Sequence, residues 1–158
     1  MTRTIDPASD WDRVAAAWDA HVDDVDGPSA RATAALLDRL AVQPGDRVLE
    51  LAAGPGSLGD TWSKLVGPTG SVVLSDIAPG MVEVARRRNA GLDNVAVAVL
   101  DASAIDRPDD SFEVVASRMG LMFTPDPAEA FAEIHRTLEP RGGLSGSLCK
   151  WRDLRVHG

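Results

Sequence analysis

The sequence of 158 residues contains a single cysteine, Cys149. One thiol cannot form an internal disulfide, and no spacing of potential ligands suggests a metal site. No apolar run approaches the roughly 20 residues that a helix needs to cross a bilayer. The first ten residues lack the apolar stretch of a secretory signal. The sequence therefore predicts a protein of the reducing cytoplasm without a membrane span.

Basic charge is also scarce. Lys and Arg total 16 against 24 Asp and Glu, which gives a formal net charge of −8. This balance argues against nucleic acid as a partner, because a phosphate backbone attracts a basic surface. Apolar residues make up 44% of the chain and charged residues 25%, which are ordinary values for a globular domain. We expect one domain with a substantial core.

The apolar pattern predicts helices first and then an alternation of strands and helices. Residues 11–22 have one apolar helical face, and a second helix is expected to open at Pro28 and Ser29 and to end near Ala41. Strands are predicted over 47–51, 71–76, 94–100, 112–117 and, more weakly, 143–148; helices are predicted at about 57–67, 79–90 and 126–138. This alternation favours an α/β domain with a parallel sheet covered on both faces.

Local signals support the predicted organisation. Pro79 suits a first helical position, and Asp126 can cap a helix that starts at Pro127. The arginines at 86–88 would form a solvated last turn. The whole chain is expected to be one domain, with amino-terminal helices over 1–42, an α/β core over 43–148 and an irregular tail over 149–158.

The first predicted strand leads into a glycine-rich loop. Residues 54–59 match GxGxxG between a strand and a helix. Gly54 and Gly56 would remove side chains where a ligand must approach the backbone. Asp76 ends the second strand 20 residues after Gly56, where a carboxylate can accept hydrogen bonds from both hydroxyls of an adenosine ribose. The loop leaves a nicotinamide cofactor and S-adenosylmethionine (SAM) both open.

Two further carboxylates discriminate between these ligands. Glu50 ends the first strand, where it would repel a pyrophosphate but suit the ammonium and sulfonium groups of SAM. Asp101 closes the third strand and can accept from an adenine amino group. Together with Asp76, these acidic strand ends favour a positively charged nucleoside.

The chain resembles the class I SAM-dependent methyltransferases, especially the ubiquinone/menaquinone-biosynthesis type. The motifs that carry the resemblance, in order, are residues 48–56, 73–81, 101–102, 109–112 and 118–123. It covers about residues 10–143 and implies a Rossmann-like, doubly wound parallel sheet that binds SAM and transfers methyl to a small-molecule acceptor. Ala52 departs from the family pattern, since many members carry glycine there.

The resemblance also implies eleven cofactor-binding positions, which are Glu50, Ala52, Gly54, Gly56, Asp76, Ile77, Met81, Asp101, Ala102, Ser117 and Arg118. The first four would surround the methionyl end, and Ser117 and Arg118 would lie beside it. Asp76 would hold the ribose, and we expect Asp76→Ala to weaken SAM binding with little effect on the fold. The next four would contact the adenine. Core packing stays open for Ile77 and Met81, as does an ion pair for Arg118.

No catalytic residue is assigned. Methyl transfer from a sulfonium is an in-line displacement that depends mainly on alignment, and a general base is optional. His21 is either such a base or a solvated helix-end residue, His135 is expected to be structural, and His157 lies in the tail. Trp11 is expected to pack in the interior, and Trp18 either packs there or belongs to a lid over the site.

The carboxyl end is short for this family. Only 15 residues follow Gly143, whereas the resemblance implies a further helix and a last antiparallel strand pair. Residues 141–158 are interpreted as a shifted reading frame or degraded end, with a short native variant left open. An unpaired sheet edge would favour self-association. A pocket that lacks the wall supplied by the missing elements would give weak SAM binding and little turnover. A SAM-binding remnant or regulatory partner without turnover is therefore the alternative function; an NAD-dependent oxidoreductase is less favoured.

Overall fold

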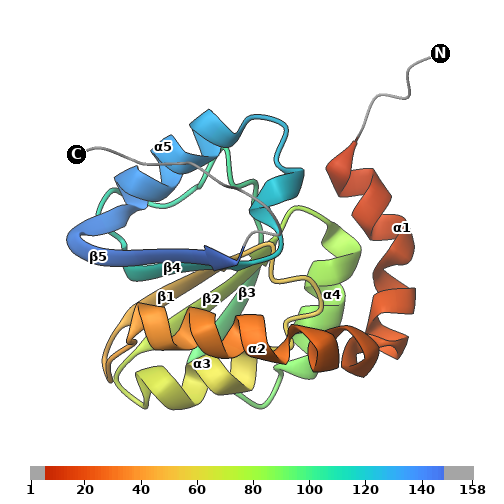
Figure 1. The fold of residues 1–158 in the computed structure, drawn as a ribbon, viewed down its shortest axis with the longest axis horizontal. Coiled ribbons are helices and arrows are strands. Elements are labelled where there is room, and N and C mark those ends of the chain that lie inside the picture. Colours follow the sequence, from red (N-terminus) through yellow and green to blue (C-terminus); the bar gives the residue numbers. More distant parts are fainter. Residues whose placement is uncertain (1–5, 148–158) are drawn as a thin grey trace.

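A computed structural model describes residues 6–147. Its five strands form one sheet in the order β3-β2-β1-β4-β5, and every neighbouring pair is parallel (Figure 1). The elements are α1 (Pro7–Ala20), α2 (Val22–Leu40), β1 (Arg47–Leu51), α3 (Gly59–Val66), β2 (Ser71–Asp76), α4 (Pro79–Arg88), β3 (Val95–Val99), β4 (Phe112–Arg118), the 3-10 turn η1 (Leu121–Phe123), α5 (Pro127–Thr137) and β5 (Leu138–Ser147). The predicted Rossmann-like, doubly wound fold is confirmed.

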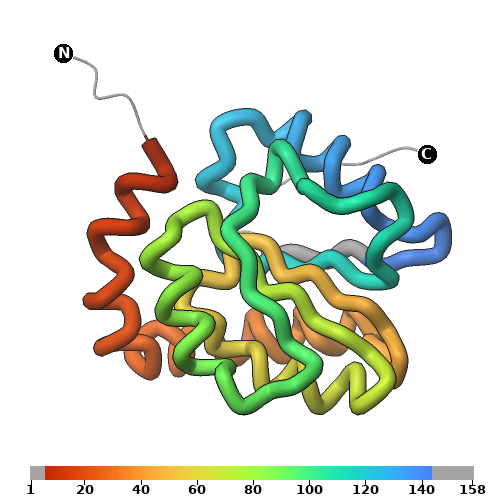
Figure 2. The backbone as a smooth tube through the Cα atoms, turned by 180° about the vertical axis from the view of Figure 1, so that it is seen from behind, coloured from red at the N-terminus to blue at the C-terminus, as the bar shows by residue number. Residues whose placement is uncertain are grey.

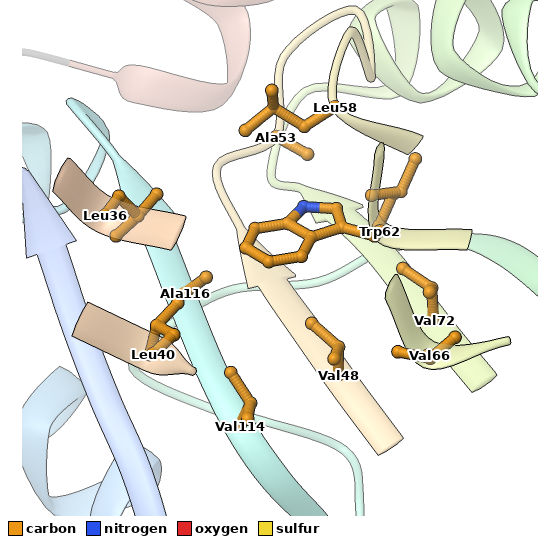
Figure 3. Packing of buried hydrophobic residues seen from close by; sticks show 11 residues of the cluster. Leu36, Leu40, Val48, Ala53, Leu58, Trp62, Val66, Val72, Val114 and Ala116 are labelled. Atoms are coloured by element: carbon orange, nitrogen blue, oxygen red, sulfur yellow. The ribbon is translucent and has the colours of Figure 1, made fainter. Parts of the chain in front are cut away.

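Successive side chains of the central strands point alternately to the two faces of the sheet and contribute to two apolar clusters, one on each face. On β1, Val48 joins the cluster under α2 and α3, whereas Leu49 and Leu51 join the cluster under α5. Figure 3 shows the first cluster, in which the indole of Trp62 lies among aliphatic side chains from the sheet and from α2. Glu50 lies between Leu49 and Leu51 in β1. Because this strand is covered on both faces, the fold requires the carboxyl group of Glu50 to be buried.

Helix α1 packs on α4 rather than on the sheet, and both views show it on the outer side of α4 (Figures 1 and 2). Asp12 of α1 accepts a hydrogen bond from the Gly80 amide at 2.6 Å. Asp19 pairs with Arg87 at 2.9 Å and with Arg88 at 2.8 Å. The arginines at 86–88 are exposed, as expected for a solvated last turn, and Arg87 and Arg88 also link α4 to α1.

The predicted beginnings of the two later helices are confirmed. Pro79 begins α4, and the Asp126 carboxylate caps α5 by accepting from the Ala128 and Glu129 amides at 3.0 and 3.1 Å. None of the helices within residues 6–147 combines the length and the apolar character that a membrane span requires.

The second helix does not begin at Pro28 as expected. It starts at Val22 and continues through Pro28, whose ring nitrogen cannot donate to the carbonyl of Asp24. Gly27 lacks the Cβ that would otherwise crowd the proline ring. The Ser29 hydroxyl donates to the Val25 carbonyl at 2.8 Å in the same turn. The apolar face of α2 against β4 and β5 therefore outweighs the local stop signal.

The fifth strand is longer than predicted. Leu138 pairs with Phe112, and after an irregularity residues 143–147 pair with residues 114–118. Backbone pairing along β4 thus extends a segment that the apolar pattern marks only weakly. The tail over 149–158, including Cys149 and His157, lies outside the described residues. β3 and β5 are the edges of the described sheet, and self-association through an open edge stays a prediction.

We predict that Pro28→Ala raises the free energy of unfolding by about 1–3 kcal/mol, because it restores a donor and removes a ring clash inside α2. Pro127 is the matched control, since it occupies the start of α5 where no donor is needed. Urea denaturation of both alanine variants tests this. A gain of equal size in Pro127→Ala, or no gain in Pro28→Ala, would contradict the explanation.

Candidate functional site

A cavity of about 360 Å³ lies at the carboxyl ends of the strands, between the sheet, α1 and the segment around η1. This volume falls within the range of roughly 300–1,000 Å³ that small-molecule sites occupy. Nine of the eleven predicted cofactor-binding residues line it, and these are Glu50, Ala52, Gly54, Asp76, Ile77, Met81, Asp101, Ala102 and Arg118. The other two, Gly56 and Ser117, are not among the lining residues.

Glu50 is less exposed than Asp76, the other buried carboxylate that lines the cavity. Its side chain belongs to β1 and is only 2% exposed. The indole Nε1 of Trp62 donates to its Oε2 at 2.7 Å. Burial raises the pKa of Glu50 to about 7, although the indole hydrogen bond and the Arg118 charge act in the opposite direction. Near neutral pH this carboxyl group can therefore exchange its proton for a bound cation.

Asp76 ends β2 and organises the loops on both sides of it. Its Oδ2 accepts from the Gly54 amide at 2.9 Å, and its Oδ1 accepts from the Ala78 amide at 3.0 Å. Burial raises the pKa of Asp76 against these backbone hydrogen bonds. Each carboxylate oxygen has a second acceptor site, so ribose hydroxyls could still bind. Because the side chain holds two backbone segments, the structure gives a reason to expect that Asp76→Ala also weakens the fold, in contrast to the expectation from the sequence.

The glycines of the loop serve two different purposes. Gly54 has φ +55°, and no atom lies within 4 Å of the position of a Cβ, so its open side faces the cavity. At Gly56 a Cβ would lie 2.8 Å from Asn89, and at Gly59 only 1.9 Å from it. Asn89 in turn donates to the Gly56 carbonyl at 3.0 Å. The end of α4 therefore gives Gly56 a packing reason to be glycine, and its expected role of clearing space for a ligand stays a prediction.

Ala52 occupies a position at which many members of the resembled family carry glycine. Its backbone is left-handed, with φ +53°. An alanine in this region costs about 1 kcal/mol relative to a right-handed conformation. A Cβ on Gly120 would lie 2.2 Å from the Ala52 Cβ. The side chain at position 52 is therefore accommodated by the absence of one at position 120, and the two residues together form part of the cavity wall.

Arg118 ends β4 and forms an ion pair, which is one of the two alternatives that the sequence leaves open for it. Its guanidinium lies 2.6 Å from the Asp26 carboxylate, and it donates to Ser57 Oγ at 2.9 Å and to Thr33 Oγ1 at 3.1 Å. Its side chain is 11% exposed. The network joins β4 to α2 and to the glycine loop. Ser117 is buried on the strand beside it, and within the described residues its Oγ has no hydrogen-bond partner.

The opposite side of the cavity is less enclosed. Asp101 is exposed, and its Oδ1 accepts from the Ser103 amide at 2.8 Å, which shapes the loop after β3. Met81 is 2% exposed and packs with Ala15 and Ala78, so core packing accounts for it even though it reaches the cavity. Ile77 is half-buried at the cavity wall.

Aromatic side chains form the wall that faces the strand ends. The Trp11 ring lies 5.9 Å from that of Trp18 and 5.2 Å from that of Phe123, both in edge-on geometry. All three line the cavity, so Trp11 does more than pack in the interior. His21 is exposed beside Asp24, at 3.0 Å, and His135 is exposed on α5; neither is among the lining residues.

Sequence reasoning missed Trp62. A tryptophan on the sheet-facing side of a helix, twelve residues after a strand-end glutamate, carries a weak signal: a buried indole N–H needs an acceptor. Nothing in the sequence marks Glu50 as that acceptor, because α3 must first pack across β1. Within residues 6–147 no three His, Cys, Asp or Glu side chains come together as a metal site would require.

The fold and the cavity define a Rossmann-like domain with a small-molecule-sized cavity that carboxylates line. Residues 48–142 match the family described as methyltransferase domain. The chain is 42% identical over 111 residues to the ubiquinone/menaquinone biosynthesis C-methyltransferase UbiE of Hydrogenovibrio crunogenus, a match that covers 68% of this chain and 44% of that protein. The chain thus spans less than half the length of the curated relatives it matches.

Solved structures agree. A chain in the complex of the Haloferax volcanii Trm112 methyltransferase activator with a methyltransferase matches with a TM-score of 0.76 and 26% identity, over 92% of this chain and 62% of that one. A SAM dependent methyltransferase from Aquifex aeolicus has the same fold, with a TM-score of 0.73 and 24% identity, over 89% of this chain and 77% of that one. The chain belongs to the methyltransferase domain family.

We predict that Asp76→Ala lowers the free energy of unfolding by about 2–3 kcal/mol, because two backbone amides lose their acceptors. Asp76→Asn should be intermediate, since it keeps one carbonyl oxygen. Asp106→Ala, at an exposed aspartate that does not line the cavity, is the control. Chemical denaturation of the ligand-free chains measures the effect. An unfolding curve for Asp76→Ala that superimposes on that of the native chain would refute the structural role.

A second prediction concerns the cost of burying Glu50. Its pKa is about 7 in the folded chain and 4.5 ordinarily, so the folded state holds the proton more tightly. The stability that protonated Glu50 contributes is therefore fully present below about pH 4.5. It is lost as pH rises to about 7, and the free energy of unfolding falls by about 3 kcal/mol in all. Glu50→Gln should be more stable than the native chain at pH 8, and the difference should shrink towards pH 4.5. Thermal unfolding across this range decides; a pH-independent difference would show that charge burial is not its cause.

Proposed function

We propose that this domain binds SAM in the cavity and transfers its methyl group to a small-molecule acceptor. The observation that supports this most strongly is the set of carboxylates at the ends of three successive strands around one otherwise largely apolar cavity: Glu50 on β1, Asp76 on β2 and Asp101 after β3. Such a set suits a cationic nucleoside and would repel a pyrophosphate. A nicotinamide-dependent oxidoreductase is accordingly not favoured. The match to methyltransferase domains likewise does not favour a remnant without turnover.

The residues present fit SAM group by group. Glu50 would accept from the ammonium of the methionyl part, which would pass over the open side of Gly54. The free acceptor sites of Asp76 would take the ribose hydroxyls. Asp101 and the backbone of Ala102 would meet the adenine edge at the more exposed end of the cavity. Ser117 and Gly56 would act behind this first layer of contacts, by supporting the backbone that the ligand touches.

When bound, SAM supplies an electrophilic methyl group, and the chain's own residues align the acceptor and exclude water. The aromatic wall of Trp11, Trp18 and Phe123 is the part of the cavity that can do both. We assign no general base, because His21 lies on the surface beside Asp24 rather than at the cavity. The acceptor of a relative such as UbiE is a property of that protein, and for this chain we propose only a small molecule.

The proposal is tested by isothermal titration with SAM and with NAD at pH 8. We expect SAM to bind and NAD to give no response. Asp101→Asn should weaken SAM binding several-fold because an acceptor for the adenine amino group is lost, whereas Asp106→Asn should not change it. Tight NAD binding without a response to SAM would overturn the assignment. Methyl transfer is then followed as release of S-adenosylhomocysteine in the presence of candidate acceptors.

A further inference from the structure

The indole of Trp62 is polar at a single atom and is otherwise part of the core. The residue is fully buried on α3, in the apolar cluster that contains Val48 and Leu36 (Figure 3). Apolar packing alone would be served by any large side chain. The Nε1 atom, however, donates to Glu50 Oε2 at 2.7 Å, and a buried N–H group placed in this way fixes the orientation of its acceptor.

Charged groups face Glu50 from three other elements. Arg118 on β4 favours the ionised carboxylate, whereas Asp26 on α2 and Asp76 on β2 disfavour it. Arg118 is itself paired with Asp26 at 2.6 Å, so its effect on Glu50 is largely offset by the partner that it holds. The direct hydrogen bond from α3 therefore stands out as the interaction that favours the charged form at short range.

We propose that Trp62 is a positioning residue for the cofactor: its indole N–H holds the Glu50 side chain ionised and oriented towards the ammonium group of SAM. The inference rests on the proposed function and extends it to a residue outside the cavity lining. Trp62 touches no ligand in this account; it acts through Glu50. The consequence is a pH dependence of SAM binding that belongs to the Trp62–Glu50 pair.

Trp62→Phe separates this role from packing. The substitution keeps an aromatic ring in the core but removes the donor, so the Glu50 proton should be held more tightly. SAM affinity of the native chain should rise with pH through about 7, until the ammonium group of SAM begins to lose its own proton. In the variant we expect the midpoint to move up by about one pH unit, which corresponds to roughly fivefold weaker binding at pH 7 and a smaller difference at higher pH. A role in packing alone would not move the midpoint.

Two controls make the measurement specific. Glu50→Gln should bind SAM weakly at every pH, and adding Trp62→Phe to it should have no further effect, because the acceptor of the indole hydrogen bond is no longer ionisable. 5′-Methylthioadenosine shares the adenosine part of SAM but lacks the ammonium group. Its affinity should be the same in the native chain and in Trp62→Phe, which also shows that the variant is folded.

The outcomes separate the two proposals. If the native chain does not bind SAM, the proposed function fails. If the native chain binds SAM and Trp62→Phe shows the same pH profile, or weakens SAM and 5′-methylthioadenosine equally at every pH, the inference about Trp62 alone is overturned.

If Trp62→Phe does not fold, the native chain still gives an answer. The solvent-protected indole N–H resonance in its NMR spectrum should shift with a midpoint near pH 7 and should shift again when SAM is added. A resonance that responds to neither would overturn the inference.

Discussion

The site depends on one constraint, the burial of an acidic side chain in the central strand of a parallel sheet. β1 is covered on both faces, and its neighbours Leu49 and Leu51 lie in the core. Glu50 must therefore lose its hydration, which is why its pKa rises to about 7. A cation that enters the cavity would replace the hydration that the Glu50 carboxylate loses on burial. Glu50 therefore destabilises the ligand-free domain but would strengthen the binding of a cation.

The groups around this carboxylate explain several features that look unrelated in the sequence. Trp62 must be tryptophan rather than a purely apolar residue if the carboxylate is to have a donor. Arg118 is held by Asp26, and this pair fixes α2 across the end of β4. α1 precedes α2 in the chain and is anchored separately to α4 through Asp19. Trp11 and Trp18, the part of the aromatic wall that α1 supplies, are thus anchored through Asp19, which does not line the cavity.

The sequence predicts the fold and most of the cavity because these depend on periodicity and on strand ends. Acidic residues at the ends of parallel strands must lie near one another, so Glu50, Asp76 and Asp101 can be placed without a structure. Contacts between distant segments could not be predicted in this way. Pro28 carries a local stop signal that packing of α2 overrides, and the reason for Gly56 is visible only once Asn89 of the α4 end lies against it.

Asp76 shows how preorganisation and binding are linked in this domain. Its carboxylate holds the Gly54 and Ala78 amides before any ligand is present, so the loop that would receive the methionyl part and the start of α4 are already fixed. A ligand that uses the remaining acceptor sites need not order these segments, and less of its binding energy is lost to conformational entropy. Glu50 has the opposite character, because it is destabilising until a cation arrives. The two carboxylates on adjacent strands therefore have different roles. Asp76 keeps the site in its binding conformation, and the desolvated Glu50 would make the binding of a cationic nucleoside favourable.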